Sequence, residues 1–216
     1  MRIYTIRHTD GAGHLDTSNS DWKVDDFPPQ APIINDWKPL KVKFVEANIG
    51  YETDLTQILS KVSSNVFSER AMTMVESNGF VTGEWLPVDT DDQTMWLLHL
   101  FTVIDCLDDQ KIKVRKFKSG RTGAIEQHAF VKDRVPPTAL FRAKNDLMNK
   151  IYCTDPFREF VMDCNLKGFL FYPVWDSNHE PYSNFPDREE IRKRPEVFGP
   201  DGFVKGFEGA WPDEWK

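Results

Sequence analysis

The sequence predicts an α+β fold: a single compact body built on two strand–helix–strand repeats with a central hairpin, an irregular N-terminal arm and a C-terminal tail. Two observations support this prediction. Residues 66–69 and residues 152–155 both place two apolar residues before a hydroxyl residue and an acid. Residues 111–118 alternate apolar and basic side chains, and a turn at 121–123 leads to a returning strand at 124–131, as in a hairpin.

The two repeats share the signals that begin and end a helix. Ser68 and Thr154 stand at the N-cap, where a side-chain oxygen accepts from free backbone amides, and the acid after each favours the helix dipole. Gly79 and Asn165 occupy one register, and both residue types tolerate the left-handed turn that ends a helix. We prefer duplication to chance similarity of two amphipathic helices. Copies this short would share a core, and a two-domain division near residue 110 is the alternative.

The elements of the first half follow from local patterns. Strands are expected at residues 2–7 and 41–46, and the Pro- and Gly-containing stretch 9–40 predicts the irregular arm. The apolar spacing within 53–62 predicts a helix that either Thr53 or Asp54 can cap. Residues 93–104 predict a buried strand or a short helix.

The second half adds a helix opened by Pro136 and Pro137, and a tail. After Asp176 the chain is rich in Pro, Gly and aromatic residues, so we expect the tail to lie on the body. We therefore divide the chain into three parts, namely an N-terminal strand and arm (1–40), an α+β domain (41–176) and a packed tail (177–216).

Composition excludes several classes of protein. The 216 residues include 27 Lys and Arg against 34 Asp and Glu, a net charge of −7, which argues against a nucleic-acid binder and against binding to anionic membranes. The 16 Phe and 7 Trp are ample for a hydrophobic core. The longest apolar stretch, 95–104, is far shorter than the ~20 residues of a membrane helix, and three cysteines without paired spacing indicate reduced thiols in the cytoplasm.

Motifs for cofactors and catalysis are missing from the sequence. No histidine or cysteine pair has zinc-finger spacing, and no glycine-rich loop has the spacing that cradles phosphates. We therefore predict no catalytic residue, no cofactor and no metal. One rival interpretation is an enzyme of unrecognised type that uses His99 with nearby carboxylates.

Charge is unevenly distributed along the chain. Residues 84–110 hold seven acids and no Lys or Arg, whereas residues 111–121 hold six bases and no acid. Grouped charges steer partners, and buried aromatic side chains anchor interfaces. These features select the candidate partner-binding residues: Asp89, Asp91, Asp92, Asp108, Asp109, Trp211 and Trp215.

Several segments together resemble immunity family eleven of bacterial polymorphic-toxin systems, formerly a domain of unknown function. The first half carries Asn65-Val-Phe-Ser-Glu-Arg-Ala and Glu84-Trp-Leu-Pro-Val, and the centre carries Val103-Ile-Asp-Cys-Leu-Asp. The closing half carries Ile151-Tyr-Cys-Thr and Phe171-Tyr-Pro-Val. The similarity spans Val45 to Trp175, and the order and spacing of the segments carry it.

The resemblance implies a protein without catalysis that binds the cognate toxin domain and blocks it in the cell that makes the toxin. The acidic loops suit a basic toxin such as a nuclease. We expect no direct contact with nucleic acid or membrane, and a homo-oligomer is left open. The alternative is a general interaction or regulatory domain without a toxin. Asp105 and Asp108 match the family's central segment, and we expect them to hold the fold by capping.

Overall fold

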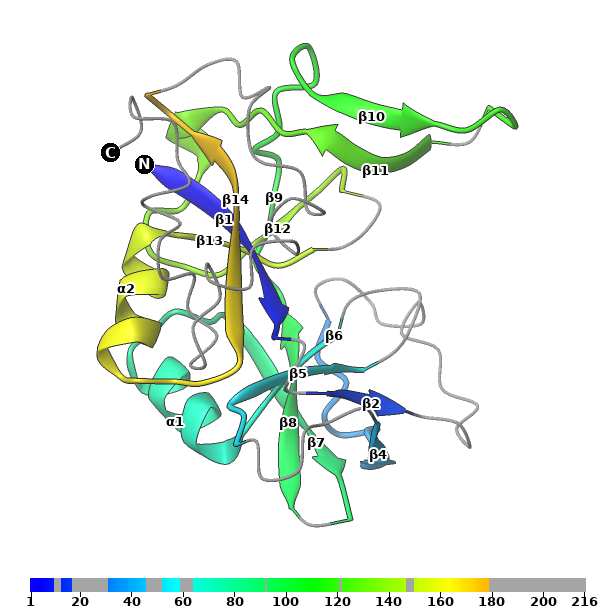
Figure 1. Ribbon diagram of the computed structural model, residues 1–216, viewed down its shortest axis with the longest axis vertical. Helices are drawn as coiled ribbons and strands as arrows, with labels where there is room; N and C mark the ends of the chain where they lie inside the picture. The colour runs from blue at the N-terminus through cyan, green and yellow to red at the C-terminus, as the bar shows by residue number, and fades with distance from the viewer. Residues whose placement is uncertain are drawn as a thin grey trace.

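The computed structural model describes residues 1–9, 13–16, 31–45, 52–58, 64–91, 93–120, 122–146 and 150–178. Within these residues strands dominate, and the α-helices are α1 (Glu69–Ser77) and α2 (Asp155–Asp163) (Figure 1). The predicted α+β class built on strand–helix–strand repeats is therefore wrong. The fold is dominated by sheets, and the largest sheet is nearly closed like a barrel.

The largest sheet has seven strands. Its spatial order is β3 (Leu40–Lys41), β7 (Gly83–Asp89), β8 (Thr94–Leu100), β6 (Ser64–Phe67), β5 (Leu55–Ile58), β2 (His14–Asp16) and β4 (Lys43–Val45). The two edge strands, β3 and β4, are separated in the chain by Val42 alone. Because one short segment supplies both edges, the sheet must curl until its edges meet.

The closure of this barrel is fixed by backbone bonds and by packing. The N–H of Val42 donates to the carbonyl of Asp89 at 3.0 Å, and Leu40 pairs in parallel with Val88. Buried apolar side chains from the strands of this sheet, together with Val42, form one core cluster: Leu15, Leu40, Val42, Ile58, Val66, Leu86, Val88, Met95 and Leu97.

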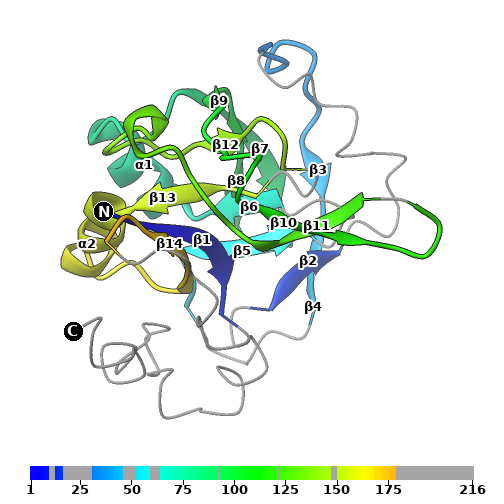
Figure 2. The same cartoon turned by 90° about the horizontal axis from the view of Figure 1, so that it is seen from above.

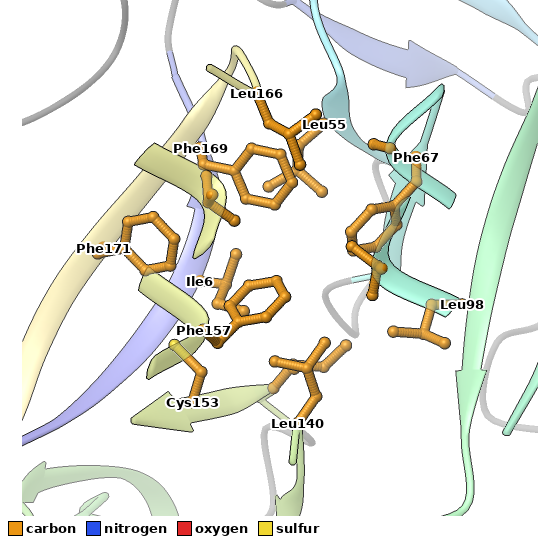
Figure 3. Close-up of a cluster of buried hydrophobic side chains, with 14 of the residues drawn as sticks. Ile6, Leu55, Phe67, Leu98, Leu140, Cys153, Phe157, Leu166, Phe169 and Phe171 are labelled. Atoms are coloured by element: carbon orange, nitrogen blue, oxygen red, sulfur yellow. The ribbon is translucent and has the colours of Figure 1, made fainter. Parts of the chain in front are cut away.

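A three-stranded sheet stands beside the barrel. Strand β1 (Arg2–His8) lies between β13 (Tyr152–Thr154) and β14 (Phe169–Asp176) and runs antiparallel to both. Helices α1 and α2 contribute to one aromatic core between this sheet and the barrel. Figure 3 shows Phe157 of α2 facing Phe169, Phe67 and Leu140. The shared core makes the barrel and the three-stranded sheet one packed body.

Two small strand pairs complete the described fold. Strand β9 (Val103–Ile104) pairs in parallel with β12 (Arg142–Ala143), and β10 (Lys113–Lys116) pairs with β11 (Thr122–Gln127). A 3₁₀ helix, η3 (Lys132–Arg134), follows β11. The predicted hairpin is present, but its turn falls earlier than predicted: Gly120 has a φ of +80° and its N–H donates to the carbonyl of Phe117.

Two predicted helices are wrong. Leu55–Ile58 is the strand β5, which pairs along its whole length with β6, so both of its faces are largely buried. A short apolar run fits both the helical period and the strand period, and pairing with β6 makes this one a strand. After Pro137 the chain enters β12 instead of a helix, because Arg142 and Ala143 pair with β9.

The predicted N-terminal arm is partly wrong. Residues 14–16 form β2, which lies inside the seven-stranded sheet and pairs with both β4 and β5. Residues 10–12 and 17–30 of the arm lie outside the described residues, as does the tail after residue 178. The division of the chain at residues 40 and 176 stays a prediction.

Candidate interaction surface

The first predicted acidic group lies at the turn between β7 and β8. Asp89 ends β7 and Asp91 lies in the turn, and both are exposed; Asp92 lies outside the described residues. Thr90 stabilises the turn, because its hydroxyl donates to the carbonyl of Gln93 and accepts from the Gln93 N–H. The carboxylates of Asp89 and Asp91 are therefore presented at a hairpin turn with its own hydrogen bonds.

The second predicted acidic group has a different role. The carboxylate of Asp108 accepts from the Gln110 N–H at 3.1 Å and lies 3.5 Å from the Lys111 ammonium. Its backbone N–H donates to the carbonyl of Ala129, next to β11. Asp108 therefore holds a turn, as we expected of it, while the neighbouring Asp109 is exposed.

The structure does not bring the two acidic groups together. In Figure 1 the β7–β8 turn lies at the lower end of the long axis, and the β10–β11 hairpin, which follows Asp109, lies at the upper end. The remaining candidates, Trp211 and Trp215, lie outside the described residues.

The basic stretch forms the β10–β11 hairpin. Lys113, Arg115, Lys116 and Lys118 are all exposed on it. Arg115 pairs with Glu126 across the hairpin at 3.0 Å, while Lys111 pairs with Asp108 at its base. Such exposed pairs contribute little stability. The acidic β7–β8 turn and the basic hairpin are therefore separate surface features of opposite charge.

His99, the residue of the rival enzyme interpretation, is hydrogen-bonded to Glu84 in the interior of the protein. Its Nδ1 lies 2.7 Å from Oε1 of Glu84, and only 3% of His99 is exposed. Both carboxylate oxygens of Glu84 also accept backbone N–H groups, from Ile33 and Ile34. The pair anchors the segment before β3 to the barrel wall. In the antiparallel β7–β8 pair Glu84 lies opposite His99. Counting residues back from the turn in the sequence would have predicted this pairing.

Asp54 is a second polar centre that sequence reasoning misplaced. Its buried carboxylate accepts from the Ser68 hydroxyl at 2.6 Å, the Arg70 guanidinium at 3.1 Å and the Lys167 N–H at 2.8 Å. Arg70 also donates to the carbonyl of Asn165. Asp54 therefore connects the start of α1 to the end of α2, which is a structural role.

A buried network surrounds Tyr152. Its hydroxyl donates to Asp146 at 2.8 Å and lies 3.2 Å from Nε2 of His128. Burial, together with the nearby Asp146 charge, raises the pKa of Tyr152 well above its usual value. The Tyr152 hydroxyl therefore stays protonated and serves as a hydrogen-bond donor inside the core.

The three cysteines are free thiols. Burial raises the pKa of Cys106 to about 12 and that of Cys153 well above its usual value. A nucleophilic cysteine needs the opposite shift, toward the thiolate. Cys106 and Cys153 therefore act as packing residues in the two cores.

The described part of the chain contains neither a candidate metal cluster nor a membrane-spanning helix. There, no three His, Cys, Asp or Glu side chains are grouped so that they could hold a metal ion. Neither described helix has the length and apolar character needed to cross a membrane.

The comparison with known protein families concerns most of the chain. Residues 15–176 match the immunity protein family (Imm11). The match begins in β2 and ends at the last residue of β14, so it covers the barrel, both helices and the hairpin. No curated protein matches the chain. Because the match covers 162 of 216 residues, the chain belongs to the immunity protein family.

Proposed function

We propose that this protein neutralises a cognate bacterial toxin domain in the cytoplasm of the toxin-producing cell, by binding it and occluding its active surface without catalysis. The match to the immunity protein family over residues 15–176 carries the proposal. Family membership suggests a non-enzymatic role, and the toxin partner and the mechanism of occlusion are our inference.

The arrangement of polar groups supports a binding role. Glu84, Asp54 and Asp146 direct their carboxylates to internal donors, where they hold the fold. Exposed acids also stand at the β7–β8 turn and exposed bases on the β10–β11 hairpin, as two separate surface features of opposite charge. Occlusion requires a rigid body with complementary charge, because charge complementarity speeds encounter and fixes orientation.

The acidic β7–β8 turn is our proposed contact for a basic toxin surface. Asp89 and Asp91 are exposed there, next to Asp92 in the sequence. Asp109 adds an exposed carboxylate at the other end of the body, and Trp211 and Trp215 are proposed as aromatic anchors. Asp108 contributes to the proposed contact only indirectly, because its carboxylate holds the turn that carries Asp109.

Co-expression with the toxin domain encoded beside the gene tests the function. We expect growth to be restored, and calorimetry with an inactivated toxin should give a stoichiometric complex. Light scattering on the free protein and the complex then gives the oligomeric state of each. Failure both to bind and to protect would refute the proposal in favour of a regulatory domain without a toxin.

Charge reversal tests the acidic contact. Changing Asp89, Asp91 and Asp92 to Lys should slow association with the toxin about tenfold at low salt and weaken the salt dependence, because steering by opposite charge is lost. Glu159→Lys with Asp163→Lys, two exposed acids on α2, is the matched control. Equal association rates for all three proteins would remove the turn from the interface.

A further inference from the structure

The β10–β11 hairpin is attached to the body by one face only. Ile125 is buried in a core cluster, and Ile112 and Val114 pack against the same cluster. Both views of the molecule show the hairpin reaching beyond the body (Figures 1 and 2). Its inner face is therefore anchored, and its exposed residues can meet a partner without any rearrangement of the core.

An aromatic side chain is held in place on this hairpin. Phe117 is 51% exposed, more than Ile34 or Met162, the other large apolar side chains exposed in the described residues. A Cβ at Gly123 would come within 2.8 Å of the Phe117 ring and 3.4 Å of the Arg115 Cβ. Gly123 thus leaves room for the ring to lie against β11. Phe117 is an exposed but positioned aromatic, the kind of side chain that anchors interfaces.

The charges around Phe117 are almost all positive. Lys113, Lys116 and Lys118 are exposed, and Arg115 is paired with Glu126. Of the described hairpin residues, Glu126 is the one acid against four bases. An acidic partner segment would therefore gain attraction from the lysines, and an apolar residue within it could cover Phe117.

We propose that the exposed face of the β10–β11 hairpin is a second docking surface for the toxin and takes an acidic toxin segment that covers Phe117. This inference rests on the proposed function. The hairpin and the acidic β7–β8 turn lie at opposite ends of the long axis and have opposite charge. Contacts of opposite sign at two separated points allow one orientation of the toxin and penalise the reverse.

A protein partner fits this surface better than a nucleic acid. Phosphate backbones are attracted by extended basic surfaces, and this chain has a net charge of −7. The lysines could instead have a structural role, because charged residues on unpaired strands prevent edge-to-edge association. Nucleic-acid binding and protection of the strand edge are therefore two alternative roles of the lysines, and each has its own experimental outcome.

The experiment measures association and dissociation rates with the inactivated toxin domain across a salt series. Neutralising Lys113, Lys116 and Lys118 to Gln should slow association about tenfold at low salt and reduce the salt slope. Phe117→Ser should raise the dissociation rate about tenfold. The matched control neutralises three exposed lysines elsewhere: Lys38, Lys43 and Lys144. Its rates should equal those of the unaltered protein.

Hydrogen exchange on the unaltered protein gives a readout that needs no variant. Binding of the toxin should protect the amides of residues 113–123, and unchanged exchange there would overturn the inference. If the unaltered protein fails to bind the toxin at all, the proposed function falls together with this inference. If it binds and protects while all hairpin variants keep its rates, the inference alone fails.

Two further outcomes also overturn the inference. Variants that self-associate in light scattering while keeping full toxin affinity would assign the lysines to edge protection. Variants that lose binding to a labelled single-stranded oligonucleotide while keeping toxin affinity would assign the hairpin to nucleic acid.

Discussion

The two helices begin with similar sequence signals and use them differently. At α1 the Ser68 hydroxyl accepts from the Ala71 N–H at 3.1 Å and donates to the Asp54 carboxylate. At α2 the Thr154 side chain makes no capping bond, and its hydroxyl donates to the carbonyl of Pro137. Pro156 in the first turn removes one N–H that would need a partner. A capping signal thus predicts where a helix begins and leaves open which bonds its hydroxyl makes.

The helices also differ in what they bury. At equivalent registers α1 places Ala71 and α2 places Phe157, and both residues are fully buried. The Phe157 ring lies within 6.3 Å, centroid to centroid, of the rings of Phe80, Phe169 and Phe171. Helix α2 therefore carries more of the shared core than α1 does.

Truncating these buried side chains should give the largest effect. Phe157→Ala should lower the free energy of unfolding by about 4 kcal/mol, through lost burial and the cavity left behind. The matched change in α1, Ala71→Gly, should cost about 1 kcal/mol, mainly through helix propensity. Urea unfolding measures both. Equal losses would show that the two helices support the core alike.

Alkaline pH should act next most strongly, through one thiol in the core beside α2 and one in the other core. The raised pKa values of Cys106 and Cys153 mean that unfolded thiols ionise first, so stability is full below about pH 8 and falls as pH rises toward the folded pKa. The Cys106 thiol should withdraw about 1.4 kcal/mol by pH 10, and Cys153 should act in the same direction. Unfolding measured from pH 7 to pH 10 tests this, and Cys106→Ala should remove one such contribution. An unchanged pH dependence in that variant would contradict the assignment.

Removing the two N-cap hydroxyls should separate their roles. Ser68→Ala should cost about 2 kcal/mol, because it removes the cap and one partner of the Asp54 carboxylate. Thr154→Ala should cost about 1 kcal/mol through the lost bond to Pro137. Hydrogen exchange distinguishes them: the amide of Ala71 should lose protection in the first variant. Loss of protection at the start of α2 in the second would show that Thr154 caps after all.

The C-terminal ends of the helices should give the smallest effects. Gly79 and Asn165 both have positive φ, of 71° and 49°, as their residue types predicted. Gly79→Ala should cost about 1 kcal/mol through conformation alone, since a Cβ there meets nothing within 4 Å. Asn165→Gly should change stability by under about 0.5 kcal/mol. Thermal unfolding measures both, and a neutral Gly79→Ala would remove the conformational argument.

Local features of the fold could be predicted from the sequence, and its architecture could not. The Ser68 cap, the residues ending both helices and the central hairpin are encoded within a few neighbouring residues. The sheet-dominated class depends on distant pairings, such as β3 with β7 and β1 with β13. The spacing of apolar residues in a short segment does not indicate which distant strand it pairs with, and so β5 was mistaken for a helix.

The candidate site shows the same limit. Exposure of Asp89 and Asp91 follows from a polar turn between two apolar strands. The internal role of Asp108 depends on Gln110 and Lys111 close by, which a capping argument anticipates. The anchoring of Ile33 by Glu84 joins residues 51 apart in the chain, and only the folded barrel reveals it.

The position of β1 sets a time at which the folded protein can first exist on the ribosome. This strand is the centre of its sheet, yet both of its neighbours come late in the chain: Ile3 pairs with Thr154 of β13, 151 residues further on. At about 5–20 residues per second, synthesis of that interval takes roughly 8–30 s. Throughout it β1 has no partner strand from its own sheet. If the protein neutralises a toxin as we propose, a cell that translates both together would gain from starting this chain before the toxin.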